Sequence, residues 1–241
     1  MADAPLEIAY SLQAEDGKRH TFQVRLHPTT LEQVDVEVEG HPDWVNLEVD
    51  QCASCPLRAE TSPQCPAARS LAALLPEAQS LMSFTRVEAE VRMAGKVVRA
   101  STSMQQALSS LVGLCMATSG CPNLAFLKPM ARFHVPFASL EETVFRATSS
   151  YLLGQYFRQL HTGTGDRGLE GLEEAYRRVH QVNMGIAHRL RRVAEGDANL
   201  NAIVRLDMFT HELPYHIGEK LAELAPYFRD YWDDTPSPGE G

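Results

Sequence analysis

Apolar and polar residues alternate along the first hundred positions of the chain, a pattern that predicts β-strands with one buried face. Asp16-Gly17 separates the first two of these runs and Ala94-Gly95-Lys96 the last two, so we expect two β-hairpins. Residues 67–75 are short and alanine-rich, with leucines at helical spacing. The predicted strands are residues 6–12, 21–26, 34–38, 44–49, 87–93 and 97–102.

From position 103 the hydrophobic period becomes helical, and residues 104–116 are expected to form the first of several helices. Residues 140–160 are apolar nearly all round, which predicts a helix buried on most sides. Residues 172–193 keep one apolar stripe and place Arg178, Arg189 and Arg192 on a solvated side. Residues 199–213 form a further predicted helix, which breaks or kinks at Pro214 before a last segment to 228.

These two halves predict an α+β fold, with an N-terminal antiparallel β-sheet packed on a C-terminal helical bundle. We expect a β-rich region with a cysteine-containing loop at 1–103, a helical bundle at 104–232 and a disordered polar tail at 233–241. A chain of 241 residues with 44% hydrophobic content can build one large core or two modest ones. The sheet and the bundle therefore form either two regions or one integrated domain.

Charge and hydropathy exclude several classes of partner. The formal net charge of −9 argues against a nucleic-acid-binding protein, which normally carries a basic face. No apolar run approaches the roughly 18 residues that a membrane span needs. The first residues lack the basic stretch and the apolar segment of a secretory signal, so a cytoplasmic location is expected. A protein partner or a small anionic ligand is compatible with this composition.

Cysteine spacing carries the sharpest chemical signal. Cys52 and Cys55 form a C-x-x-C pair, and Cys65 follows ten positions later. Cys121 stands between Gly120 and Pro122 and is the expected fourth ligand of a closed four-thiolate site. The remaining Cys115 lies inside a predicted helix, where a buried thiol behaves as a small hydrophobic group, although it stays an alternative fourth ligand.

Such a site would hold one zinc ion or one iron–sulfur cluster, and the spacing does not decide between them. A redox dithiol and unrelated thiols are the alternatives, because a lone C-x-x-C pair is a weak signal. A closed shell of four thiolates leaves no position for a substrate, so we expect a structural centre in a binding or regulatory module.

A second group of candidate residues follows in the segment 116–146. An extended chain here would place Lys128, Arg132 and His134 on a common side, near Arg146, as an anion pocket. This is the site of the alternative interpretation, an enzyme of unknown reaction with a pocket around residues 116–146. Internal ion pairs with Glu141 and Glu142 are the structural explanation of the same charges.

The C-x-x-C-P-L motif, the later S-G-C-P segment and the block from P-M-A-R-F-H to Y-L-L-G-Q-Y-F resemble an uncharacterised bacterial family, a domain of unknown function. The resemblance covers most of the chain. It implies no activity, and it assigns no role to any residue.

Overall fold

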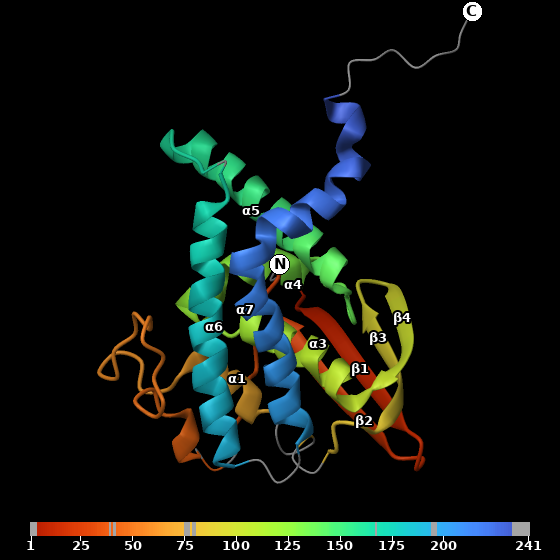
Figure 1. Ribbon diagram of the computed structural model, residues 1–241. Coiled ribbons are helices and arrows are strands. Elements are labelled where there is room, and N and C mark those ends of the chain that lie inside the picture. The colour runs from red at the N-terminus through yellow and green to blue at the C-terminus, as the bar shows by residue number, and fades with distance from the viewer. Residues whose placement is uncertain are drawn as a thin grey trace, which may run out of the picture.

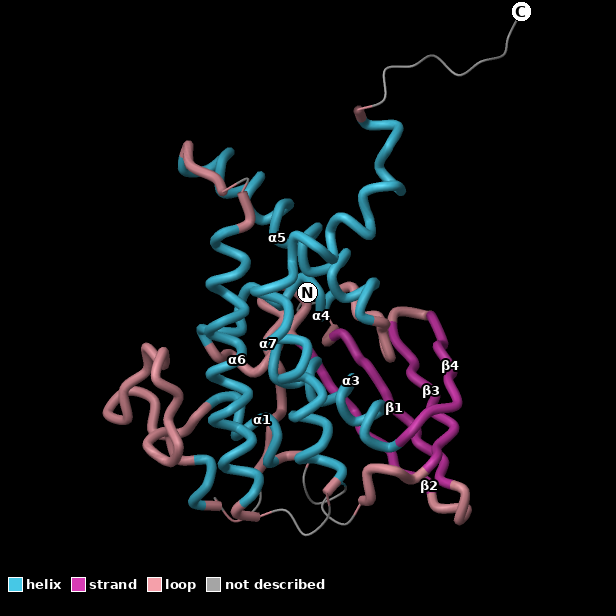
Figure 2. Tube along the Cα trace, viewed as in Figure 1, coloured by secondary structure: helices cyan, strands magenta, loops and turns pink. Residues whose placement is uncertain are grey.

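The computed structural model of the chain describes residues 4–38, 40, 42–74, 78, 81–166, 168–193 and 197–232. A four-stranded antiparallel sheet in the order β2-β1-β3-β4 forms one layer, and helices cover one of its faces (Figures 1 and 2). This arrangement confirms the α+β fold. The strands are β1 (Leu6–Ala14), β2 (Arg19–Leu26), β3 (Arg86–Met93) and β4 (Lys96–Ser103). The expected tail at 233–241 lies outside the described residues.

Both predicted hairpins are present. β1 pairs with β2 across the turn at Gly17, and β3 pairs with β4 across Ala94 and Gly95, which both have positive φ angles. The alternation of the sequence is visible in β1, where every second side chain from Ile8 to Ala14 is buried. The buried face of the sheet packs against α3 and the neighbouring helices, and one continuous cluster of apolar side chains joins them.

The helical part follows the predicted order. The elements outside the sheet are η1 (Asp43–Val45), α1 (Pro66–Ala72), α3 (Met104–Ala117), η2 (Pro122–Leu127), α4 (Lys128–Arg132), α5 (Leu140–Thr162), α6 (Glu170–Arg191), α7 (Ala198–Leu224) and η3 (Ala225–Tyr231). A second, smaller apolar cluster lies between α5, α6 and α7. Among the described residues no single helix is both long and apolar enough to cross a membrane, and the one combination that qualifies, α3 with Pro122–Arg132, is bent by 115°.

Two of the predicted strands are not strands. Residues 34–38 alternate as a strand would, but Leu31 and Asp35 take positive φ angles of 58°, which interrupts an extended chain. Residues 44–49 begin in the short helix η1 and continue as turns. Isolated bridges pair Gln33, just before the first segment, with Leu26, and Asn46, in the second segment, with Gln64.

Three helical predictions are also corrected. Residues 128–132 form helix α4 rather than an extended segment, since a proline in the first turn, here Pro129, favours helix initiation. Helix α5 is not buried on most sides: its buried residues are Val144, Ala147 and Thr148, while its second half exposes large apolar side chains. Of the two outcomes expected at Pro214, a break or a kink, the break does not occur, because helix α7 continues to Leu224.

Candidate functional site

The C-x-x-C pair lies on a tight turn that is closed by its own backbone hydrogen bond, and Arg189 holds the segment before it. The Cys55 N–H donates to the Cys52 carbonyl at 2.9 Å. Upstream of the turn, the buried Arg189 guanidinium of α6 donates to the carbonyl oxygens of Trp44, Asn46 and Leu47 at 2.6 to 3.0 Å. Arg189 is therefore not part of the solvated face that its sequence position suggested.

Cys65 and Cys121 share one local geometry. Each stands at the N-cap of a helix, in an extended conformation (φ −70°, ψ 117° and φ −65°, ψ 123°), and each precedes a proline at the first helical position. Proline excludes the helical conformation from the residue before it, and its own φ suits a helix start. Two of the three Cys-Pro pairs of the sequence thus fix thiols at helix N-termini.

A side-chain contact joins the Cys121 turn to the C-x-x-C turn. The Asn123 amide donates to both the carbonyl and the hydroxyl oxygen of Ser54 at 3.1 Å, across 69 positions of sequence. This contact brings two separate segments of the chain together, and the Cys65 thiol of a third segment lies near enough to act on the thiols of both Cys52 and Cys121. We call the thiols gathered there the four-cysteine cluster: Cys52, Cys55, Cys65 and Cys121.

Thiol pKa values show that the members of the cluster lie close to one another. Burial, together with the neighbouring thiols of the other three members, raises the pKa of Cys52 to about 12. Burial also raises the pKa of Cys121 to about 11. The backbone N–H groups of Asn123 and Leu124 act in the opposite direction, because they stabilise the thiolate. Within the described ranges, however, no three His, Cys, Asp or Glu side chains stand where they could hold a metal ion. The thiols thus interact without adopting coordinating distances.

Cys115 is separate from the cluster. It lies inside α3 and is 2% exposed. Burial raises its pKa to about 12, while hydrogen bonds from Gln33 and Ser70 act in the opposite direction. Among the described residues, the side chains that act on the Cys115 thiol are Gln33 and Ser70 rather than another cysteine. Of the two candidates for a fourth ligand, Cys121 is the one that lies beside the other three.

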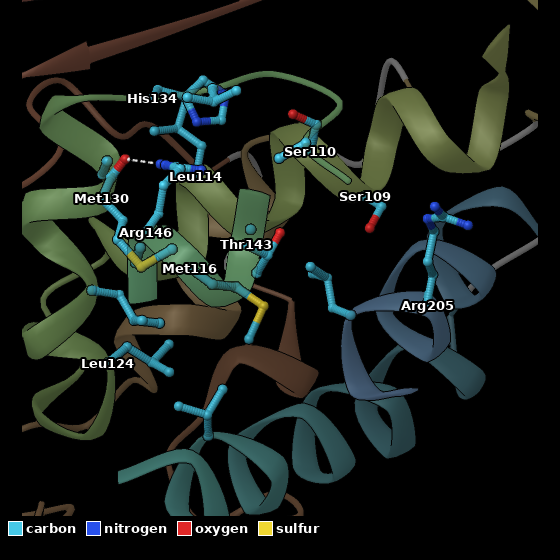
Figure 3. A pocket seen from close by; sticks show the side chains of 18 of the residues that line it. Ser109, Ser110, Leu114, Met116, Leu124, Met130, His134, Thr143, Arg146 and Arg205 are labelled. Atoms are coloured by element: carbon cyan, nitrogen blue, oxygen red, sulfur yellow. Dashed lines mark hydrogen bonds between the residues drawn. The ribbon is translucent and has the colours of Figure 1, made fainter. Parts of the chain in front are cut away.

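The four residues of the predicted anion pocket are distributed over different surroundings. Lys128 pairs with Glu32 at 2.8 Å. The Arg132 guanidinium lies over the Phe133 ring, 5.4 Å from its centroid, on the surface. His134 and Arg146 line a pocket of about 190 Å³ between α3, α4, α5, α6 and α7 (Figure 3). The structure therefore brings two of the four residues to the pocket, which lies where the sequence interpretation expected one.

His134 belongs to a hydrogen-bond chain that reaches the sheet. Its Nε2 lies 2.5 Å from the Tyr10 hydroxyl, which lies 3.0 Å from the hydroxyl of Ser110. Burial lowers the pKa of His134 to about 4, and the nearby Arg146 charge adds to the effect. The imidazole is thus neutral at pH 7 and a weak base.

The full lining of the pocket could not be predicted from the sequence, because its walls come from several helices. Asn183 of α6, Arg205 of α7 and Tyr176 of α6 join it from 30 or more positions beyond the segment 116–146 that the sequence singled out. An isolated tyrosine on an apolar helix stripe carries no signal of such a role.

Comparison with known proteins gives a family without a function. A family model described as a domain of unknown function (DUF6901) matches residues 8–229. No curated protein matches the chain, and no solved structure matches it.

Proposed function

Because the chain belongs to the DUF6901 family, which supplies no activity, we propose from its own residues that the four-cysteine cluster binds one metal centre. The observation that supports this most directly is the convergence of four thiols from three segments of the chain, one of which is held by the Asn123–Ser54 contact. Sulfur ligands of this number are typical of structural zinc sites and of iron–sulfur clusters.

Local chemistry at the cluster suits a thiolate ligand. Backbone N–H groups at the start of η2 point at the Cys121 sulfur, and hydrogen bonds of this kind stabilise the charged form. Without a metal, burial keeps the Cys52 and Cys121 thiols protonated at pH 7. A cation among the sulfurs reverses this balance, so binding releases protons and draws the thiolates inward.

The proposed role of the centre is structural. A shell of four thiolates leaves no open coordination position, so the metal stabilises the loop that it closes rather than activating a substrate. The loop between Leu47 and Cys65 contains no helix or strand, and the centre would fix it to the end of α3. We therefore assign the protein to binding or regulatory modules rather than enzymes. The proposal implies a reducing compartment such as the cytoplasm, where thiols remain free.

Metal analysis of protein purified without oxygen and without chelators tests the proposal. We expect one zinc ion per chain in a colourless preparation, or iron and inorganic sulfide in a brown one. Cys55→Ser should lose the metal and unfold at a lower temperature. Cys115→Ser is the matched control, because Cys115 lies away from the cluster, and it should keep the metal.

Two results would overturn the proposal. One is a protein that carries no metal and takes up neither Zn²⁺ nor Co²⁺ after reduction. The other is a Cys55→Ser variant that retains the metal of the parent protein. Formation of a stable Cys52–Cys55 disulfide in the native protein would instead support the redox-dithiol alternative.

A further inference from the structure

The pocket beside Arg146 is walled mainly by hydrocarbon. Leu114, Met116 and Leu124 are buried side chains that face it, and Met130 closes it on the α4 side (Figure 3). An apolar cavity of about 150 Å³ can hold benzene. The volume of about 190 Å³ therefore fits one aromatic ring, or a short branched chain, together with one small polar substituent.

Arg146 brings a cation to this apolar space. Its Nη2 donates to the carbonyl oxygens of Met130 and Phe133 at 2.7 and 3.2 Å, which fixes the guanidinium at the pocket wall. Within the described ranges no carboxylate forms an ion pair with it. Glu142, the acidic residue whose charge acts on Arg146, accepts the Ser139 N–H at 2.7 Å in the cap of α5. Burial lowers the pKa of Arg146, as expected for a cation that lacks a full counter-charge.

Tyr176 supplies a second donor near this cation. Its ring is 5% exposed and packs edge-on against Phe126, with the ring centroids 5.7 Å apart. Its hydroxyl has no hydrogen-bond partner within the described residues, although the residue lines the pocket and interacts electrostatically with Arg146. The hydroxyl is thus available to donate a hydrogen bond to a bound acceptor.

Arg146 and Tyr176 together define the polar end of a ligand. A guanidinium only donates hydrogen bonds, and its planar donors match a carboxylate. The neighbouring His134 is neutral and adds no positive charge beside Arg146, while Arg205, the other arginine of the lining, lies on the other side of the pocket (Figure 3). We propose that the pocket binds a small apolar monocarboxylic acid. Its carboxylate lies on Arg146 and Tyr176, and its hydrocarbon body lies against Leu114, Met116 and Leu124.

Calorimetric titration of the full chain with phenylacetate tests this proposal. We expect saturable one-to-one binding, weakened at least about tenfold when the neutral isostere phenylacetamide replaces phenylacetate, because a charge-assisted hydrogen bond is lost. Inorganic phosphate should not compete. Hexanoate, which carries the same head group on a flexible chain, should compete for the same site.

Variants separate the pocket from unspecific effects. Arg146→Met should weaken phenylacetate binding at least about tenfold, and Tyr176→Phe should weaken it severalfold while keeping the ring packing. Arg132→Met is the matched control, since that arginine lies on the surface beside Phe133, and it should bind like the parent protein. If Arg146→Met does not fold, Tyr176→Phe still decides the question.

Three outcomes would overturn this proposal: no binding of either acid at millimolar concentration, equal binding of phenylacetamide, or unchanged binding in both pocket variants. Tighter binding of phosphate than of phenylacetate would overturn it in favour of a phosphoanion site. None of these results depends on the metal centre, whose loss is measured separately by metal content.

A different observation, the exposure of large apolar side chains on two helical arms, carries an independent inference. The second half of α5 and the end of the chain at η3 both leave the body of the molecule (Figure 1). They are tied at their base by the stacked rings of Phe145 and Phe228, with the centroids 6.3 Å apart. The exposed apolar residues of the α5 arm are Leu152, Leu153, Tyr156, Phe157 and Leu160, and those of the η3 arm are Tyr227, Tyr231 and Trp232.

The apolar area of the two arms together is that of a protein–protein interface. These side chains are 41% to 85% exposed, equivalent to about five complete large side chains, or roughly 1,000 Å² at ~200 Å² each. A standard interface buries ~800 Å² per partner, so the two arms offer enough apolar area for one.

Charge favours a second copy as the occupant. The chain carries a net charge of −9, so two copies repel over most of their surface. The arm of α5 between 147 and 162 contains one charged residue, Arg158, and no acidic residue, so two chains can meet there without like-charge repulsion between carboxylates. We propose that the α5 arm of one copy packs on the η3 arm of the other in a two-fold symmetric dimer.

Sedimentation equilibrium across micromolar concentrations tests the dimer. We expect a monomer–dimer equilibrium whose Kd rises at least about tenfold in Phe157→Asp and in Tyr231→Asp, because each buries a charge in the interface. Phe84→Asp changes an exposed phenylalanine between residue 81 and β3, away from both arms, and should leave the Kd unchanged. A monomer at every concentration, an assembly larger than two chains, or an unaffected dimer in both arm variants would overturn the proposal.

Discussion

Arg189 illustrates how one buried charge is accommodated without an acidic partner. Its side chain is 2% exposed, and its donors are taken up by three backbone carbonyls of residues 44–47. Those carbonyls belong to turns rather than to a sheet, so they have no strand to bond with. The guanidinium therefore satisfies a segment that would otherwise bury unpaired acceptors.

Removal of this guanidinium should destabilise the whole protein. Arg189→Met keeps most of the side-chain volume but leaves the carbonyls of the buried Trp44 and Leu47 without a donor, so we expect the free energy of unfolding to fall by roughly 3 kcal/mol. Urea denaturation measures the change. Arg178→Met, on the same helix, removes one surface ion pair to Glu174 and should cost less than about 1 kcal/mol. Equal losses in the two variants would contradict this account.

His134 makes stability depend on pH. Its ring is neutral in both the folded and the unfolded state well above pH 6.5, its ordinary pKa. As the pH falls from 6.5 toward 4, the unfolded chain takes up the proton and the folded one does not, so stability declines over this window.

Replacement of His134 should remove this part of the acid sensitivity. We expect His134→Gln to lose roughly 2 kcal/mol less than the parent protein between about pH 7 and pH 4.5, since one pKa unit corresponds to about 1.4 kcal/mol. Urea denaturation at the two pH values gives both differences. The same pH-dependent loss in the variant and the parent would show that other groups are responsible.

At the scale of elements, the close packing of α6 on the cysteine loop is the contact that positions the site. Gly185 of α6 faces the loop so closely that an added Cβ would lie 3.0 Å from the Asp50 carbonyl oxygen and 3.7 Å from the Cys52 Cβ. A neighbouring ion pair between Arg192 and Asp50, at 2.9 Å, holds the same end of α6 against the loop.

A methyl group at position 185 should disturb this contact. Alanine is the better helix former by about 1 kcal/mol, but the backbone oxygen at 3.0 Å must move away to admit the Cβ. We expect Gly185→Ala to lower the unfolding temperature and to weaken metal retention. Gly218→Ala in α7, where nothing lies within 4 Å of the added Cβ, should raise the unfolding temperature. A stabilising effect at both positions would refute the close packing.

Elements with one consistent local signal were predictable from the sequence. The hairpin at Gly17 combines alternating residues with a turn dipeptide, and the apolar stripe of α6 gives its helix unambiguously. The prediction of a strand at residues 34–38 was wrong because an alternating pattern does not report φ angles, and Leu31 and Asp35 take positive φ. The exposure of α5 could not be predicted for a related reason. The sequence of an apolar helix has the same pattern whether its own chain or another molecule covers it.

The same limit applies to the candidate sites. The spacing of the cysteines and the Cys-Pro pairs are features of the sequence itself, so the sequence alone was enough to nominate the four cysteines of the cluster. The pairing of Lys128 with Glu32 is a contact across 96 positions, and the donors around the pocket come from helices far apart in the chain. Residue types alone could not tell which cations face the pocket and which face the solvent.

At the scale of the whole molecule, the sheet and the helices share one apolar core. The main cluster runs from Ile8 of β1 to Ile203 of α7 and includes side chains of α1, α3 and α6. The division at position 103 therefore separates elements that bury one another, and β4 continues directly into α3.

A shared core predicts one cooperative unfolding transition. We expect a calorimetric scan of the full chain to give a single peak, with a calorimetric enthalpy equal to the van't Hoff enthalpy, measured at one protein concentration and with the metal content fixed. Two separated transitions would show that residues 1–103 and 104–232 melt independently.

The two tryptophans occupy opposite environments, which gives the molecule two optical reporters. Trp44 is 6% exposed and its carbonyl is held by Arg189 next to the cysteine loop, whereas Trp232 is 59% exposed at the end of the η3 arm. Indole emission shifts to the red in water, so the native spectrum is the sum of a blue and a red component. Acrylamide quenches the red component first. Opening of the cysteine loop would change the blue component alone, and association through the arms would change the red one alone.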